Sequence, residues 1–197
     1  MRPRDPMFRA GETHSPHTAY LLTAAALVAG CLLRQYLAVN LVSQSMPRGI
    51  YLLLRPPGQS RPRLALLCLP PELGRFGRAR GYLGVGACPG GVAALLKPVV
   101  ATEGDVVAVD SRGVRVNGEL LPRSAPLARD REGRPLAVAW TGPAPLPPGT
   151  VFVVSTFTER SWDSRYWGPL PVSSLRARAV PLLLEEPLPV PLGPGSR

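Results

Sequence analysis

The chain has 197 residues, of which 45% are hydrophobic and 18% are charged, a composition typical of one folded domain and not of a disordered chain. Its 20 glycines and 25 prolines interrupt it too often for a helical bundle. The net charge of +10 comes from scattered arginines with few aromatic residues between them. We therefore expect no nucleic-acid partner and favour an anionic membrane surface as the reason for the charge.

The ionisable side chains exclude several kinds of catalytic site. Both histidines, His14 and His17, lie near the N-terminus, so the rest of the chain lacks the parts of a Ser-His-Asp triad or a histidine-containing zinc site. We expect no metal and no cofactor. Of the 23 basic residues, 22 are arginine and one, Lys97, is lysine. A coding bias explains most of that imbalance, but a desolvated lysine can lose its proton and an arginine cannot.

The N-terminal region is typical of a membrane anchor. Residues 1–17 carry three arginines and are predicted to be a basic cytoplasmic tail. Residues 18–33 are uncharged, and with Arg34 at the headgroups the segment 18–37 is long enough to cross a membrane. A signal peptide and a buried core helix are the alternatives.

Beyond residue 40 the pattern is that of short β-strands separated by proline and glycine. Asn117-Gly118 predicts a two-residue hairpin turn, and no later segment has helical periodicity over three turns. We expect a mainly β domain over residues 38–184, and a Pro-rich disordered tail over 185–197. The expected strands are 49–54, 64–69, 105–110, 114–116, 119–121, 136–140, 151–155 and 175–184.

The three cysteines fall in two settings. Cys31 lies within the apolar N-terminal segment, whereas Cys68 and Cys88 lie in the β region. If that region is exported, an oxidising compartment favours a Cys68–Cys88 disulfide. Two unrelated buried thiols are the alternative.

Three segments carry candidate chemistry: 43–49, 95–105 and 161–169. A serine nucleophile without histidine needs another base, and a lysine amine can serve if desolvation lowers its pKa. Lys97 has apolar neighbours in the sequence, and Ser45 precedes Met-Pro, whose rigid backbone can hold a nucleophile in place. Each segment alone is weak evidence.

Together these segments resemble the signal peptidase I family, which uses a Ser-Lys dyad. Ser45-Met46 matches its first motif, Lys97 leading into Gly104-Asp105 its second, and residues 161–168 its third. The resemblance spans about residues 20–180 and implies a signal-peptidase-like fold of short antiparallel strands behind one N-terminal transmembrane or signal helix.

Other features resemble the conjugal-transfer (TraF-type) branch of that family, whose members mature the pilin of a conjugative type IV secretion system. Pro47 directly follows Met46, and the string C-P-G-G occupies residues 88–91. The domain is also too short for the large β insertion of the housekeeping enzymes.

The resemblance implies roles for six residues. Ser45 matches the nucleophile, Lys97 the general base and Ser161 the serine that orients the lysine. Ser43 matches the residue that forms the oxyanion hole with the Ser45 backbone N–H. Asp163 and Arg165 match a structural ion pair that holds the third motif.

Two positions depart from the family pattern. Glu103 stands where the family usually has proline, and residues 155–158 (S-T-F-T) stand where it has Gly-Asp-Asn. The second departure leaves the support of Ser161 open.

The resemblance thus predicts a serine endopeptidase in the inner membrane, with a periplasmic catalytic domain that processes a precursor protein such as a pilin. Its acyl-enzyme would be released by water or, as in the conjugative branch, by the amino terminus of the substrate. The alternatives are a general signal peptidase, a catalytically silent subunit of a secretion apparatus, and a self-cleaving repressor. The complete set of serines and lysine argues against the silent subunit. The apolar segment occupies the place of the DNA-binding domain that a repressor needs.

Overall fold

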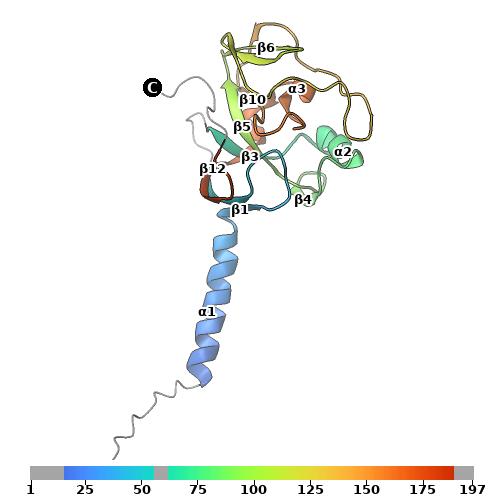
Figure 1. The fold of residues 1–197 in the computed structure, drawn as a ribbon. Coiled ribbons are helices and arrows are strands. Elements are labelled where there is room, and N and C mark those ends of the chain that lie inside the picture. Colours follow the sequence, from blue (N-terminus) through green and yellow to red (C-terminus); the bar gives the residue numbers. More distant parts are fainter. Residues whose placement is uncertain (1–15, 56–61, 189–197) are drawn as a thin grey trace, which may run out of the picture. The chain divides into compact units, whose positions relative to one another are not determined.

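The computed structural model describes residues 16–55 and 62–188, and the chain divides into two compact units, residues 1–35 and 36–197. The predicted basic tail up to residue 15 and the end of the Pro-rich tail from residue 189 lie outside the described residues. In the first unit, α1 (Pro16–Arg34) is one continuous helix (Figure 1). It exposes apolar side chains, among them Tyr20 and Leu21, which are 74% and 71% exposed. By length and composition, residues 17–34 could cross a membrane.

The second unit is mainly β, as predicted, and its paired strands are antiparallel. The larger sheet has seven strands in the order β1-β2-β12-β3-β5-β10-β11. These strands are β1 (Leu37–Asn40), β2 (Gly49–Leu54), β3 (Leu64–Leu67), β5 (Leu95–Thr102), β10 (Thr150–Val153), β11 (Leu170–Pro171) and β12 (Leu175–Leu184).

A smaller sheet of four strands, ordered β8-β7-β6-β9, lies at the opposite end of this unit from β1 (Figure 1). Its strands are β6 (Val106–Asp110), β7 (Gly113–Val116), β8 (Glu119–Leu120) and β9 (Ala144–Pro145). The predicted Asn117-Gly118 turn joins β7 to β8, with both residues at positive φ, 51° and 88°. That backbone conformation is the one that a two-residue hairpin turn requires.

The segment 136–140 was predicted to be a strand and is not one. It bonds to the rest of the domain through single contacts: the Ala139 N–H donates to the Arg165 carbonyl at 3.0 Å and Trp140 Nε1 donates to the Val107 carbonyl at 2.9 Å. Val138 and Trp140 are apolar because they pack on a core cluster. The edge of β6 is paired instead with β9, a few residues further along the chain.

Several elements were not predicted. Helix α2 (Pro71–Ala79) contains two glycines, which lower helix propensity, and both are buried. The short strand β4 (Val85–Cys88), the helix α3 (Ser164–Trp167) and a 3-10 turn (Val172–Ser174) complete the fold.

Strand β5 takes part in all three clusters of buried side chains. Its Val99 belongs to the cluster around β3 and β10, and Val100 and Ala101 belong to the cluster beneath the smaller sheet. Leu96 packs against the third cluster, which contains Met46 and Tyr51. Lys97 therefore lies on the strand that the rest of the domain packs around.

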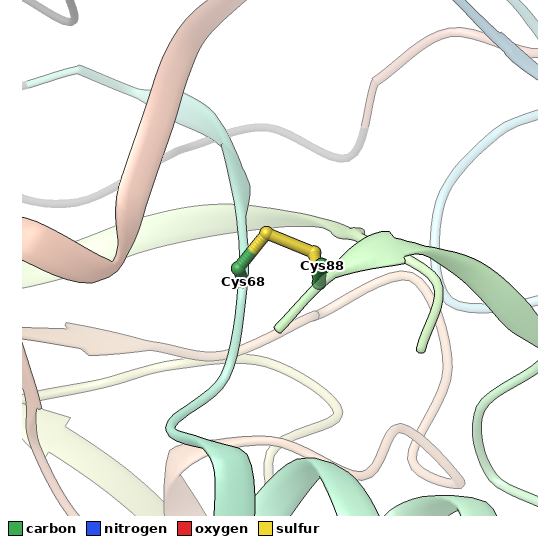
Figure 2. Close-up of a disulfide and its surroundings, with 2 residues drawn as sticks. All are labelled: Cys68 and Cys88. Carbon is green, nitrogen blue, oxygen red and sulfur yellow. A yellow bond between two sulfur atoms is a disulfide. The ribbon is translucent and has the colours of Figure 1, made fainter. Parts of the chain in front are cut away.

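Cys68 and Cys88 form a disulfide, as the sequence indicates for an exported domain (Figure 2). Their Cα atoms are 5.5 Å apart and both residues are buried. Cys68 directly follows β3 and Cys88 ends β4, so the bridge closes a segment of the chain that contains α2. Cys31 is a free, exposed cysteine on α1.

Candidate active site

The loop between β1 and β2 carries Ser43 and Ser45, and the side chain of Asn40 bonds its backbone at three places. Asn40 Nδ2 donates to the carbonyls of Met46 at 2.9 Å and Pro47 at 3.0 Å, and its Oδ1 accepts from the Ser43 N–H at 3.0 Å. Met46, which directly follows Ser45, is 1% exposed, so its buried side chain anchors the loop in the core. One asparagine at the end of β1 thus turns the backbone that holds both serines.

Two further side chains hold this loop from inside the domain. Tyr51 Oη donates to the Pro47 carbonyl at 2.6 Å, and burial raises the pKa of this phenol to about 12, so that it remains a donor. The Ser155 hydroxyl donates to the Ser45 carbonyl. The carbonyl of Ser45 is therefore fixed by a contact between residues that are 110 positions apart.

The hydroxyl of Ser45 is bonded to Ser43 in this structure. The two Oγ atoms are 2.9 Å apart, and the Ser45 N–H donates to Ser43 Oγ at 3.3 Å. Ser45 is half-buried and Ser43 is exposed. The loop thus presents two hydroxyls and one backbone N–H at one place.

Lys97 is buried on β5 with only 2% of its surface exposed. Its Nζ donates to the Oγ of Ser161, which is also buried, at 2.7 Å. Burial lowers the pKa of the Lys97 amine from its ordinary 10.5 to about 8, while the Asp163 carboxylate opposes this change and the Arg165 guanidinium adds to it. At neutral pH about a tenth of the amine is therefore in the neutral form.

Asp163 and Arg165 form an ion pair in which neither side chain is exposed. Arg165 Nε is 2.8 Å and its Nη2 is 3.0 Å from the two carboxylate oxygens of Asp163. Arg165 Nη2 also donates to the Ser161 carbonyl at 2.9 Å, and Asp163 Oδ2 accepts from the Ser155 N–H at 3.1 Å. This bidentate pair links Ser161, the partner of the lysine, to Ser155, the support of the Ser45 loop.

Ser43, Ser45, Lys97 and Ser161 line one groove with a volume of about 940 Å³. Its walls come from Leu66 and from five segments within residues 38–46, 80–85, 93–97, 127–136 and 158–166. In the described part of the chain, no three His, Cys, Asp or Glu side chains are grouped as a metal site requires. The groove can therefore offer a hydroxyl, an amine of lowered pKa and backbone donors to an extended peptide.

Sequence reasoning missed Asn40 and Ser155, both of which hold the Ser45 loop. A lone asparagine or serine carries no local signal, because its partner carbonyl is set by the fold. The Ser155 position was noticed only as a departure from the Gly-Asp-Asn pattern. The other departure has a structural role: Glu103 accepts a hydrogen bond from the Gly149 N–H at 2.9 Å, and neither residue lines the groove.

Comparisons with known proteins match most of the chain. Residues 21–183 match the family model described as "Signal peptidase, peptidase S26". The chain is 38% identical to a "Plasmid transfer protein TraF" from Escherichia coli over 88% of this chain and 94% of that protein. It is 40% identical to a "Conjugal transfer protein TraF" from Agrobacterium fabrum over 74% of this chain and 82% of that protein.

Among solved structures, a signal peptidase I from Enterococcus faecalis V583 matches 61% of this chain and 96% of its own, at 17% identity and a TM-score of 0.35. The family match spans all three segments that carry Ser45, Lys97 and Ser161. On that match and on the similarity to the two transfer proteins over most of their length, the chain belongs to the signal peptidase family, peptidase S26.

Proposed function

We propose that this chain is a membrane-anchored serine endopeptidase in which Ser45 is the nucleophile and Lys97 the general base. One observation carries the proposal: the only lysine of the chain is buried, has a pKa of about 8, and lines the same groove as Ser45. Burying a charged lysine amine lowers the stability of a fold, and burial therefore favours the neutral amine, which is the form that a general base requires. Membership of a peptidase family supplies the reaction class.

In the first step, the neutral amine of Lys97 takes the proton of the Ser45 hydroxyl as Oγ attacks the scissile carbonyl. The C–O bond forms and the carbonyl becomes an oxyanion. The hydrogen bond between Ser161 and Lys97 holds the amine in place, and the ion pair of Asp163 and Arg165 holds Ser161.

The oxyanion is stabilised by the Ser43 hydroxyl and the Ser45 backbone N–H. Without substrate these two groups bind each other, since the Ser45 N–H donates to Ser43 Oγ. Substrate binding therefore rotates the Ser43 hydroxyl so that both groups donate to the carbonyl oxygen. Donors of this kind are worth about 10²-fold to 10³-fold each in the rate of acyl transfer.

In the second step, the Lys97 ammonium gives its proton to the leaving amine as the C–N bond breaks. An acceptor then attacks the acyl carbon while Lys97 takes its proton. The ester bond to Ser45 Oγ breaks, and the Lys97 ammonium returns that proton to the Ser45 oxygen, which regenerates the enzyme. Water as the acceptor gives hydrolysis, and the amino terminus of the substrate gives a cyclic product.

The substrate of this proposal is an exported precursor, the pilin of a conjugative type IV secretion system. The supporting observation is the similarity to proteins named for plasmid and conjugal transfer. The proposed location is the inner membrane, with α1 as the anchor and the second unit in the periplasm. The apolar length of α1 and the Cys68–Cys88 bridge, which suits an oxidising compartment, support this location.

Cleavage of a purified pilin precursor by the full-length protein in an uncharged detergent tests the proposal. Wild type should give a shorter product by mass spectrometry, and Ser45→Ala should give none. A secretory precursor assayed in parallel serves as the comparator. Preferential cleavage of that comparator would favour a general signal peptidase, and failure to cleave either would contradict an enzymatic role.

A further inference from the structure

The residues that line the groove include more basic than acidic side chains. Four arginines line it from three segments of the chain, and two acidic residues accompany them. The arginines are Arg80, Arg131, Arg134 and Arg160, and the acidic residues are Asp130 and Glu132. The groove therefore carries an excess of positive charge, and the inference from it rests on the proposed peptidase function.

Two of these arginines are occupied by structural contacts. Arg134 Nε is 2.6 Å and Arg80 Nη1 is 4.0 Å from Asp130 Oδ2, and Tyr82 Oη donates to the same oxygen. Arg80 also donates to the Pro135 carbonyl at 2.9 Å, while Arg134 donates to the Arg80 carbonyl at 2.8 Å. These contacts fasten the 127–136 wall to the 80–85 wall and use the charge of Asp130.

Arg131 and Arg160 are different, because neither has an acidic partner among the residues that the structure describes. Both are exposed to the groove, and the remaining acid, the exposed Glu132, leaves an excess of one positive charge over the pair. The groove therefore contains two guanidinium groups whose charge no carboxylate of the described residues neutralises in an ion pair.

Both arginines lie beside the reacting groups. Arg131 donates to the side-chain oxygen of Gln44, the residue between Ser43 and Ser45. Arg160 directly precedes Ser161, whose Oγ bonds the Lys97 amine. Both guanidinium groups therefore line the groove that a peptide must enter to reach Ser45.

We propose that Arg131 and Arg160 bind a carboxylate of the substrate within a few residues of the scissile bond. The carboxylate is an Asp or Glu side chain or, where the mapped cleavage site lies near the end of the precursor, its free C-terminus; both offer the same planar pair of oxygens. Guanidinium groups match that pair with two parallel hydrogen bonds, which a lysine cannot do. The same charges reject precursors with basic residues at that position, so the groove selects by repulsion as well as by attraction.

Binding to the full-length Ser45→Ala protein in an uncharged detergent tests the proposal without turnover. The probe is a fluorescent peptide of about 12 residues that spans the cleavage site mapped in the precursor assay, a length that fills an extended groove. One variant peptide has its Asp and Glu replaced by Asn and Gln, and another has its C-terminal carboxylate replaced by an amide. Loss of affinity in the first identifies a side chain as the source, and loss in the second identifies the chain terminus.

We expect one of the two uncharged peptides to bind about tenfold more weakly than the parent, as loss of a charge-assisted hydrogen bond predicts. The ratio of the two dissociation constants, uncharged peptide over parent peptide, is then about ten. In a protein that also carries Arg131→Gln and Arg160→Gln, this ratio should fall to near one. Arg176→Gln, which removes an exposed arginine of β12 outside the groove, is the matched control and should keep the ratio. Reversing the charges with Arg131→Glu and Arg160→Glu should turn the preference toward a peptide with Lys in place of the acidic residue.

The outcomes separate the two proposals. If wild type cleaves the precursor but all three peptides bind alike, or the ratio survives the double arginine replacement, the carboxylate site is wrong and the peptidase proposal stands. If wild type cleaves no precursor, the proposed function fails and the assignment of the arginines to a substrate fails with it.

Discussion

Lys97 is the residue on which the proposed chemistry depends, and its surroundings lower the pKa of its amine toward neutral pH. Its strand buries it, Ser161 bonds it, and the buried ion pair behind Ser161 supplies a carboxylate and a guanidinium whose effects on its pKa oppose each other. Desolvation therefore decides the direction of the change. A side chain that served only as a cation would gain nothing from this site.

Replacing Lys97 by arginine separates a base from a mere positive charge. Because a guanidinium stays protonated at any working pH, we expect Lys97→Arg to lower kcat/KM for precursor cleavage by at least about 10²-fold. Circular dichroism should show that the variant is folded. Arg176→Lys, the reverse replacement at an exposed position, is the control. Cleavage by Lys97→Arg at near the wild-type rate would end the dyad proposal.

The lowered pKa also predicts two pH profiles. Wild-type kcat/KM should rise with an apparent pKa of about 8, because only the neutral amine accepts the Ser45 proton. Since the folded pKa lies below the ordinary 10.5, the folded protein binds fewer protons than the unfolded chain between these values. Its stability should therefore increase by about 3 kcal/mol as the pH rises from 8 to 10.5, and this gain is lost again as the pH falls from 10.5 to 8. Chemical denaturation of Lys97→Met should lack this increase.

At the scale of elements, helix α2 depends on the absence of one side chain. A Cβ on Gly77 would lie 2.6 Å from Cζ3 of Trp162, whose ring is held by Phe76, Tyr82 and Trp167. Alanine favours an ordinary helix by about 1 kcal/mol over glycine, but overpacking costs about 1 to 3 kcal/mol.

We therefore expect Gly77→Ala to lower the free energy of unfolding by about 1 kcal/mol, as measured with denaturant, which is the difference of those two effects. Because Trp162 is next to Ser161, cleavage should fall as well. Gly142→Ala, where the added Cβ has no atom within 4 Å, should change neither quantity. Equal stability of the two variants would show that the Trp162 ring can move.

The disulfide holds the segment that contains α2. Replacing both Cys68 and Cys88 by serine should lower the free energy of unfolding by about 3 kcal/mol, because the cross-link closes a loop of about 20 residues. Denaturant unfolding of the double variant measures this, and Cys31→Ser on α1 is the control without a bridge. An unchanged unfolding midpoint for the double variant would contradict a stabilising role.

The sequence predicts elements whose signals are local. The strands at 49–54 and 175–184 have the predicted bounds, and the Asn117-Gly118 turn is where its residue types require it. Helix α2 was missed because its glycines argue against a helix, and only packing against Val92 and Trp162 explains them. The prediction of a strand at 136–140 was wrong, because Val138 and Trp140 are apolar residues that pack against a core cluster without forming a strand.

The candidate site divides in the same way. Ser45, Lys97 and Ser161 were found because their motifs are short and continuous, whereas their roles stay predictions until cleavage is measured. Ser155 and Arg131 act on residues far along the chain, so no spacing could reveal them. Asn40 bonds residues only three to seven positions away, but a lone asparagine before a loop does not show which carbonyls it bonds. Arg131, for example, contacts Gln44 across 87 positions.

At the scale of the whole molecule, an apolar helix precedes a β domain with a disulfide, and together they predict a topology. A C-terminal alkaline phosphatase fusion should be active, because the proposed periplasmic domain carries it out of the cytoplasm. A fusion that lacks residues 1–37 should be inactive, since it has lost the anchor and the charges before it. Activity of a fluorescent reporter that folds only in the cytoplasm would contradict this orientation.

Strand β5 packs into three clusters of buried side chains, which ties its local opening to the unfolding of the whole domain. A segment packed into one cluster can open while the others stay closed, but a segment shared by three opens only when the molecule unfolds. We therefore expect the amide hydrogens of β5 to exchange with solvent mainly through global unfolding. Between such rare events, protons reach the amine of Lys97 only through the mouth of the groove.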